Sequence, residues 1–389
     1  MISVDSSEII TSALAAPKVA DGIEQLADRQ VLIYGAGNYG RIIHRLLTEN
    51  GFPQHGIAGF LDAAPDGREI AGYTVRNPKD PAIPETLRQH AVVVISIYSS
   101  IEEHDRIAEK LHLLGYRNVR SCYDIAISFY TANDPKTRLA GSDYFHQNYQ
   151  NIVEGSTVWD DQVSRETYVR HFNGYARCDI RQFKHEESHR QYFLPRLFRK
   201  DRPVRFIDCG AFDGDTVREL FAQIGRVEAL ALFEPCDTNL KALQRFIRMN
   251  RNDLSDEIIL FPCGVWDTTT QLCFDNGAAA ASAVSTAGES CIQCVALDDA
   301  LHGFRPTFIK MDVEGAEPAA LRGAEAMIRE YKPDLAISVY HSLSHFWEIP
   351  KIVRQWVPEY RLFLRTYAAA GFETVMYATV AGTSNGVNQ

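Results

Sequence analysis

Acidic and small residues follow a predicted strand near the middle of the chain, in a pattern that suits ligand binding. The segment reads Val204-Arg-Phe-Ile-Asp208-Cys-Gly210-Ala211-Phe212-Asp213-Gly214-Asp215-Thr216. A glycine after a strand lets the backbone approach a ligand closely, and a threonine can begin the next helix. A phosphate site favours free amides and basic residues, whereas this turn carries three carboxylates and no Lys or Arg. The composition therefore indicates a cationic ligand rather than a polyphosphate.

Two further strand ends carry groups that suit a nucleoside. The strand predicted at Ala229 to Phe233 runs into Glu234 and Pro235. An acid placed roughly 20 residues after a glycine turn can hydrogen-bond ribose hydroxyls. The strand predicted at Ile258 to Pro262 is followed by Gly264, Val265, Trp266 and Asp267, where an aromatic ring and an acid suit the edge of an adenine. The alternative, a nucleotide-free turn with capping aspartates, is disfavoured by three successive strand ends of this kind.

Candidate reacting groups lie after two later strands. The strand predicted at Thr307 to Met311 belongs to the run Phe308-Ile-Lys310-Met-Asp312-Val-Glu314-Gly315-Ala-Glu317, and alternation places Lys310, Asp312 and Glu314 on one side. His341 follows the strand predicted at Leu335 to Tyr340 and is the expected proton acceptor, because the pKa of a histidine lies near neutral pH. A histidine bonded to a loop carbonyl is the alternative.

Glu314 and Glu317 are the other candidates for proton transfer: one would orient an acceptor while the other caps the following helix. Asp312, Glu314 and His341 could coordinate Mg²⁺, as oxygen-rich sites do. Nothing in their spacing requires an ion, so no metal is assigned.

These motifs resemble those of the FkbM family of methyltransferases. The likeness rests on Asp208 to Thr216, Phe233-Glu-Pro235 and Ile309 to Glu317. Three further segments agree with it, namely Tyr340-His341, Trp347 to Pro350 and Glu373 to Tyr377. The resemblance covers about residues 160 to 379. It implies a class I Rossmann-like fold, S-adenosylmethionine (SAM) as cofactor, and methylation of a hydroxyl on a sugar, glycan or related natural product. It also implies that Asp208, Gly210, Asp213, Glu234 and Asp312 contact the cofactor. His345 and Thr366 depart from the family pattern, where an acid and a histidine are expected, and both departures concern the acceptor side.

A second glycine turn lies near the N-terminus. Gly35-Ala-Gly37-Asn38-Tyr39-Gly40 follows a strand predicted at Val31 to Tyr34 and precedes a helix predicted at Arg41 to Asn50, and Asp62 ends the strand Ile57 to Leu61. Alone, this pattern is a dinucleotide fingerprint, but no segment suited to hydride transfer follows it. Two segments, Gly59 to Asp62 and Ile70 to Val75, resemble the N-terminal binding domain of sugar acyltransferases of the PglD type. This resemblance implies that a nucleotide or nucleotide sugar binds at the Gly35 turn. A purely structural module that serves dimerisation is the alternative.

Two metal motifs are set aside. His185-Glu-Glu-Ser-His189 matches HExxH, but its polar neighbours are typical of a solvated connector helix rather than of a buried protease helix. Cys291-Ile-Gln-Cys294 is a single CxxC pair, which is typical of two thiols on a strand.

The length of 389 residues and the alternation of strands with helices predict two α/β domains. We expect a Rossmann-like domain over residues 1–130, with a further strand at Ala91 to Ile97 and a helix at Ile101 to Leu114. A helical connector is expected over residues 131–200, with helices at Asp161 to Asn173 and Glu187 to Phe198. The cofactor domain covers residues 201–389 and ends in an antiparallel pair, Tyr360 to Thr366 and Glu373 to Thr379.

A net charge of −10 argues against nucleic acid and anionic lipid as partners. No apolar run is long enough to span a bilayer, and residues 1–5 lack the features of a signal peptide. We therefore expect a cytoplasmic protein with reduced cysteines, a small-molecule or glycan substrate, and compatibility with a homodimer. Two other functions stay open. One is a regulatory or scaffold protein that binds SAM and a nucleotide without turnover, and the other is an NAD-dependent oxidoreductase that uses the Gly35 turn.

Overall fold

The computed structural model describes residues 26, 28–49, 51–125, 142–177, 179–184, 190–194, 197, 202–274, 284–285 and 290–380. The chain folds into two compact units. The first comprises Met1–Gln150, Val169–His185 and Ala368–Gly371, and the second Asn151–Tyr168, Glu186–Tyr367 and Phe372–Gln389. Residues of the predicted connector are thus divided between both units.

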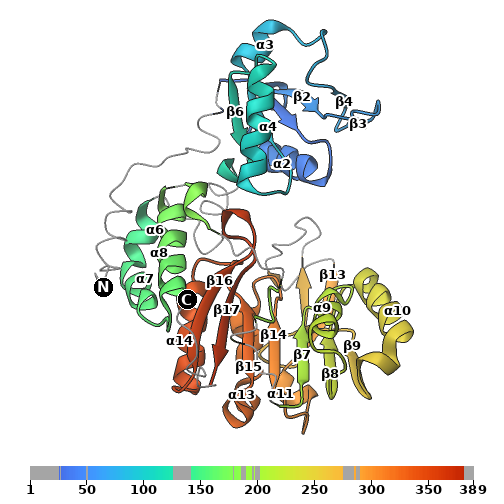
Figure 1. The fold of residues 1–389 in the computed structure, drawn as a ribbon, viewed down its shortest axis with the longest axis vertical. Helices are drawn as coiled ribbons and strands as arrows, with labels where there is room; N and C mark the ends of the chain where they lie inside the picture. Colours follow the sequence, from blue (N-terminus) through green and yellow to red (C-terminus); the bar gives the residue numbers. More distant parts are fainter. Residues whose placement is uncertain are drawn as a thin grey trace. The chain divides into compact units, whose positions relative to one another are not determined.

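The first unit contains a six-stranded sheet in the order β3-β4-β2-β1-β5-β6, with α2 and α4 alongside its strands (Figure 1). Its elements are β1 (Val31–Tyr34), α2 (Asn38–Glu49), a 3-10 turn η2 (Gln54–Gly56), β2 (Ile57–Leu61), β3 (Glu69–Ile70), β4 (Tyr73–Arg76), α3 (Glu85–His90), β5 (Val92–Ile95), α4 (Ile101–Leu113) and β6 (Asn118–Ser121). All pairings are parallel except that of β3 with β4. The predicted Rossmann-like alternation is confirmed.

Local sequence explains these elements. β5 is a run of β-branched residues buried on both faces, as expected for a central parallel strand. Ser100 caps α4 by accepting a hydrogen bond from the backbone amide of Glu103 at 3.2 Å. The same helix buries His104, Ile107 and Leu111, which share one helical face.

Three helices follow: α6 (Ser142–Gln147), α7 (Tyr149–Ser156) and α8 (Gln162–Arg177), and then a 3-10 turn η3 (Ile180–Gln182). α8 confirms the helix predicted at Asp161 to Asn173. The helix predicted at Glu187 to Phe198 is wrong at residues 190–194, which are not helical; there Tyr192 and Phe193 are buried in the core of the second unit instead. The HExxH segment lies outside the described residues.

The second unit is built on a seven-stranded sheet in the order β16-β17-β15-β14-β7-β8-β9 (Figure 1). Its elements are β7 (Arg205–Cys209), α9 (Asp215–Ile224), β8 (Ala229–Phe233), α10 (Asp237–Leu254), β9 (Glu257–Phe261), α11 (Leu297–Ala300), β14 (Phe308–Met311), α12 (Glu317–Arg322), α13 (Glu325–Tyr331), β15 (Asp334–Ser338), α14 (His345–Trp356), β16 (Arg361–Thr366), a 3-10 turn η4 (Ala369–Gly371) and β17 (Thr374–Thr379). β17 runs antiparallel to both of its neighbours, which confirms the predicted antiparallel pair.

The strand order reverses between β7 and β14, because the chain first adds β8 and β9 on one side and later adds β14 and β15 on the other. Ligands of doubly wound sheets bind at the carboxyl ends of the strands beside such a switch point. The residues after β7, β8, β14 and β15 therefore meet at the edge where a ligand is expected. Beneath them, Phe206, Leu230, Leu232 and Phe308 are buried in one apolar core, each contributing about 1.5–3 kcal/mol by burial.

A smaller sheet of four strands, in the order β10-β13-β11-β12, accompanies the main one. Its strands are β10 (Gly264–Val265), β11 (Thr270–Phe274), β12 (Val284–Ser285) and β13 (Ser290–Val295). β13 confirms the strand expected for the CxxC pair. Cys291 is disulfide-bonded, so the expectation that every cysteine is reduced is wrong at this position.

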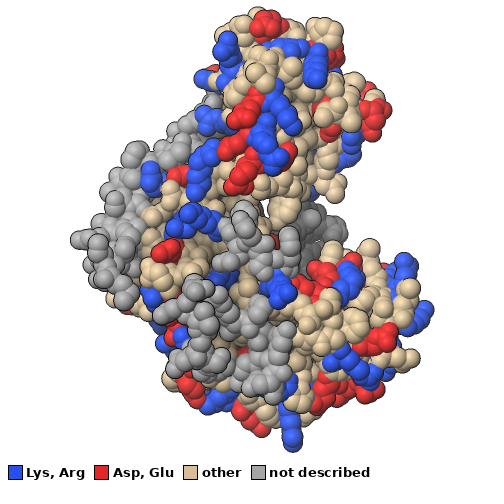
Figure 2. Space-filling model, in the orientation of Figure 1, with Lys and Arg blue, Asp and Glu red and all other residues tan. Residues whose placement is uncertain are grey.

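Among the described residues, no helix is both long and apolar enough to cross a membrane. On the face shown in Figure 2, basic and acidic side chains are interspersed over both units.

Candidate active site

The carboxyl end of β7 belongs to a buried ion pair. Asp208 Oδ1 lies 3.1 Å from Lys310 Nζ, and the two side chains are 0 % and 3 % exposed. They are register partners on the parallel strands β7 and β14. Lys310 Nζ also donates a hydrogen bond of 2.6 Å to the carbonyl oxygen of Gly210. Asp208 and Lys310 thus hold the turn from within the core instead of presenting polar atoms to solvent.

The protonation of this pair follows from its surroundings. Burial raises the pKa of Asp208 to about 6, although the charge of Lys310 acts in the opposite direction. Burial would lower the pKa of Lys310, but the carboxylates of Asp208 and Asp312 outweigh it and raise that pKa. Lys310 is therefore a fixed ammonium at neutral pH, and it positions the turn rather than exchanging protons.

Gly210 joins the turn to the segment after β14. Its φ is +88°, and a Cβ atom there would lie 2.0 Å from the carbonyl oxygen of Asp312, so only glycine fits. Phe212 has a φ of +47° and exposes 53 % of its surface beside this contact. Of the other predicted members of the turn, Ala211 and Thr216 are buried, Asp213 forms an ion pair with Arg218, and Asp215 begins α9.

Glu234, after β8, bridges two segments of backbone. Its Oε2 accepts a hydrogen bond from the Phe212 amide at 2.9 Å, and its Oε1 accepts one from the Cys236 amide at 2.8 Å. Burial raises the pKa of Glu234, and these amides partly offset that effect. Asn239 Nδ2 also donates to Oε1, at 3.4 Å. Because each carboxylate oxygen has two lone pairs, Oε2 retains accepting capacity for a ligand hydroxyl.

The third predicted strand end, after β9, is part of the smaller sheet. Gly264 and Val265 form β10, which pairs with β13, and the Trp266 amide donates to the carbonyl oxygen of Val295 at 2.9 Å. The backbone of Trp266 packs closely against Gly323. The contact of Trp266 with an adenine stays a prediction.

His341 lies among three carboxylates after β14 and β15, with 9 % of its side chain exposed. Its Nδ1 is 2.9 Å from Glu317 Oε1, and its Nε2 is 3.4 Å from Glu314 Oε2 and 3.6 Å from Asp312 Oδ1. We call these four residues the acidic–histidine cluster. The partner of Nδ1 is a carboxylate and not the loop carbonyl of the alternative interpretation.

Glu317 is wholly buried at the start of α12. Its Oε1 also accepts hydrogen bonds from the amides of Val313, at 2.9 Å, and Gly315, at 3.3 Å. Burial would raise the pKa of Glu317, but the adjacent His341 and His345 lower it to about 2. Burial would also lower the pKa of His341, yet Glu317, Glu314 and Asp312 raise it well above its usual range. Proton removal from an acceptor requires the neutral form of this ring, and the role of His341 as the proton acceptor stays a prediction.

Comparison with known proteins agrees with this geometry. Residues 208–371 match the model of the methyltransferase FkbM domain. A solved structure titled methyltransferase FkbM from Methylobacillus flagellatus KT aligns with a TM-score of 0.74 and 20 % identity, covering 96 % of this chain and 99 % of that one. At this identity the likeness establishes the fold, and its coverage includes both units.

Fibrillarin from Aeropyrum pernix, solved with natively bound S-adenosyl-L-methionine, aligns at 12 % identity over 46 % of this chain and 67 % of its own. Its TM-score of 0.27 is too low to support an argument. Comparison with curated proteins gave no match.

Several polar residues of this site were not singled out from the sequence. Tyr192 donates a hydrogen bond of 2.9 Å to Asp312 Oδ2. Tyr340 packs against the His341 ring at a centroid distance of 4.1 Å, and its hydroxyl lies 3.4 Å from Glu373 Oε1. Gln191 donates to Glu373 Oε2 at 2.6 Å. Tyr340 and Glu373 lie inside segments that resemble the FkbM family, and this resemblance could have identified them as site residues. Residues 191 and 192 fall in a range that was expected to be helical, so the local sequence carried no such indication for them.

The N-terminal glycine turn belongs to the other unit. Gly35 has a φ of +107°, and a Cβ at Gly40 would lie 2.0 Å from the carbonyl oxygen of Gly35, so the turn is as tight as predicted. Asp62 accepts hydrogen bonds of 3.0 Å from the amides of Ala36 and Ala64. Asp62 thus stabilises the turn itself. The FkbM domain model begins at residue 208 and does not cover this turn. A nucleotide-sugar ligand at Gly35, Gly37, Asn38, Tyr39, Gly40 and Asp62 stays a prediction.

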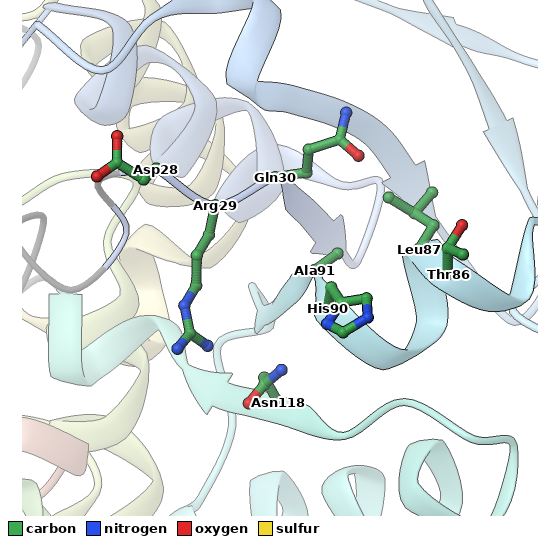
Figure 3. A pocket seen from close by; sticks show the side chains of 8 residues that line it. All are labelled: Asp28, Arg29, Gln30, Thr86, Leu87, His90, Ala91 and Asn118. Carbon is green, nitrogen blue, oxygen red and sulfur yellow. The ribbon is translucent and has the colours of Figure 1, made fainter.

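A pocket of about 570 Å³ lies in the first unit, away from this turn (Figure 3). Its lining includes Gln30, Ala91 and Asn118, which lie just before or at the start of β1, β5 and β6. The pocket therefore opens at the amino edge of the sheet, whereas Gly35 follows the carboxyl end of β1.

Proposed function

We propose that this protein transfers a methyl group from SAM to a hydroxyl of a sugar, glycan or related natural product. One observation carries the proposal: the glycine turn after β7 and the acidic–histidine cluster after β14 meet where Gly210 packs against Asp312. In our proposal the turn binds the cofactor and the cluster assists proton transfer, and both lie within the residues that match the methyltransferase FkbM domain model.

The chemistry of the turn fits SAM. SAM carries a sulfonium that makes its methyl group reactive, together with an amino acid and an adenosine. Ion pairs neutralise two of the three carboxylates of the turn, Asp208 with Lys310 and Asp213 with Arg218. Asp215, Glu234 and Asp312 are the other acidic groups at this edge. Residues 210–216 and Asp312 would border the cationic part. Glu234 and Pro235 would border the ribose, and Gly264, Val265 and Trp266 the adenine.

The chain must also assist the departure of a proton from a neutral hydroxyl. In our proposal His341 and Glu314 face the acceptor, because Glu314 is the exposed member of the cluster, at 62 %, and lies beside His341 Nε2. Glu317 and Lys310 are positioning residues, since neither reaches solvent. The choice of a sugar, glycan or related acceptor follows the resemblance to the FkbM family.

Titration calorimetry with SAM tests cofactor binding. We expect Glu234→Gln to weaken SAM binding by about tenfold or more, because the carboxylate loses its charge. Glu228 precedes the same strand β8 at its opposite end, so Glu228→Gln is the matched control and should bind SAM like the wild type. An absence of binding heat in the wild-type protein would overturn the proposal.

Transfer is tested with methyl-labelled SAM and a panel of glycans, nucleotide sugars and polyhydroxylated metabolites. Mass spectrometry then locates the label. Label on an oxygen supports the proposal, whereas label on nitrogen or carbon, or SAM binding with no transfer to any hydroxyl, contradicts it.

A further inference from the structure

The Nε2 atom of His341 is buried, faces two carboxylates and makes no hydrogen bond. Asp312 Oδ1, at 3.6 Å, is likewise buried without a hydrogen bond. We propose that Asp312, Glu314 and His341 hold a divalent cation. Spacing along the sequence did not require an ion here; the three-dimensional arrangement supplies the reason.

The distances from His341 Nε2 to the two carboxylate oxygens suit ligands of a shared ion better than direct hydrogen bonds. Hydrogen bonds between nitrogen and oxygen have separations of about 2.7–3.2 Å, whereas Nε2 is 3.4 Å and 3.6 Å from the two carboxylate oxygens. Two ligands about 2.1 Å from one ion are about 3.4 Å apart at a tetrahedral angle. Two of the three proposed ligands, Asp312 and His341, belong with Glu317 to a group whose ligand atoms lie within 4.8 Å of one another. Glu314 is not part of that group, and its exposed side chain would complete the ligand set in our proposal.

The remaining atom of each buried ligand is held by a neighbour. Glu317 bonds His341 Nδ1, which directs Nε2 toward the carboxylates. Tyr192 bonds Asp312 Oδ2 and leaves Oδ1 facing the site. Metal-binding histidines and carboxylates commonly have outer partners of this kind, which fix their orientation. Glu317 is thus a positioning residue for the ion.

The backbone brings Glu314 to the site in a conformation that a non-glycine residue seldom adopts. Its φ is +53°, next to Gly315 at +95°. Such a conformation costs about 1 kcal/mol or more and is often retained at ligand sites. Because the Glu314 side chain is 62 % exposed, coordination positions on the solvent side stay open for water or an acceptor.

One imidazole and two carboxylates suit a divalent ion such as Zn²⁺, which takes nitrogen and oxygen ligands in tetrahedral geometry, and Mn²⁺ serves as the spectroscopic probe of the site. This inference deepens the proposed function, on which its role rests: an ion here would bind the acceptor hydroxyl and lower its pKa. The binding of the ion does not itself depend on SAM.

The test is a titration of the chelator-treated full-length protein with Mn²⁺ in the absence of SAM. Binding is measured as the loss of the free Mn²⁺ signal in electron paramagnetic resonance. We expect one site per chain. Glu314→Gln and His341→Gln should each weaken binding at least tenfold, while Glu325→Gln, a partly exposed carboxylate on α13, should not. Circular dichroism confirms that each variant is folded, and Glu314 is a safe choice because its side chain is exposed. The absence of a Mn²⁺ site, or binding unchanged in both cluster variants, would overturn the inference.

The two proposals fail separately. Mn²⁺ binding in a protein that transfers no methyl group would leave the ion site standing and remove the proposed function. Full methyl transfer in excess chelator, together with the absence of a Mn²⁺ site, would leave the proposed function standing and remove the ion site.

Discussion

Gly210 and Asp312 are in such close contact that a single added methyl group would lie 2.0 Å from a carbonyl oxygen. We predict that Gly210→Ala lowers the free energy of unfolding by about 2–4 kcal/mol, because the strain of a positive φ is added to a clash with backbone. Gly225 has a similar φ of +73° with open space around it, so Gly225→Ala isolates the conformational strain, about 1 kcal/mol. Urea denaturation measures both, and equal losses in the two variants would contradict the contact.

The buried pair of Lys310 and Asp208 leads to a second prediction. Lys310→Met leaves a carboxylate in the core without its partner, and we expect a loss of about 3–5 kcal/mol in the free energy of unfolding. Addition of Asp208→Asn should restore part of that loss, since no buried charge then remains. Lys241 pairs with Asp237 on the surface, and Lys241→Met should leave the urea midpoint unchanged. A Lys310→Met variant as stable as the wild type would show that the pair does not support the turn.

A third prediction concerns turnover. His341→Gln should reduce kcat by about 10²–10⁴-fold, because assistance to proton loss from the acceptor is removed, while the Kd for SAM stays within about threefold of the wild-type value. His302→Gln, at an exposed site of the same domain, should retain full activity. If His341→Gln turns over normally, the cluster has no part in proton transfer.

Glu219 on α9 provides a test of pH dependence. Burial raises its pKa to about 7, while a hydrogen bond from Gln223 acts in the opposite direction. Because the folded-state pKa lies above the unfolded one, its contribution to stability is fully present below about pH 4.5 and is lost as the pH rises through about 7.

We therefore expect the free energy of unfolding of the wild type, relative to Glu219→Gln, to fall by about 1–2 kcal/mol between pH 5 and pH 8, allowing for solvent screening of a half-buried group. Urea denaturation of both proteins at the two pH values measures this difference. A difference that stays constant with pH would show that Glu219 is not perturbed.

The fold was largely predictable because its strands have strong local signals. β2 and β8 have the predicted bounds, and the antiparallel partner strands at the end of the chain were expected. The error at residues 190–194 has a physical cause. Tyr192 and Phe193 are buried by the core of the second unit, and this packing overrides a polar, helix-like local pattern.

The sequence predicted which residue types belong to the site, but not which side chains form ion pairs and hydrogen bonds with one another. Asp208 was expected at the cofactor, yet it is buried against Lys310, a partner 102 positions away that only strand order brings near. His341 was expected as a free base, yet Glu317 bonds it, because α12 begins beside the end of β15. Glu373 and Gln191 meet only in the folded chain. Such contacts depend on tertiary structure, which spacing along the sequence does not encode.

Lys310 and Asp312 lie two positions apart at the end of one strand. Lys310 holds the glycine turn after β7, and Asp312 borders His341. An insertion or deletion between them would displace both halves of the centre together. Under the proposed function, a change of acceptor preference would therefore have to preserve the length of this strand end.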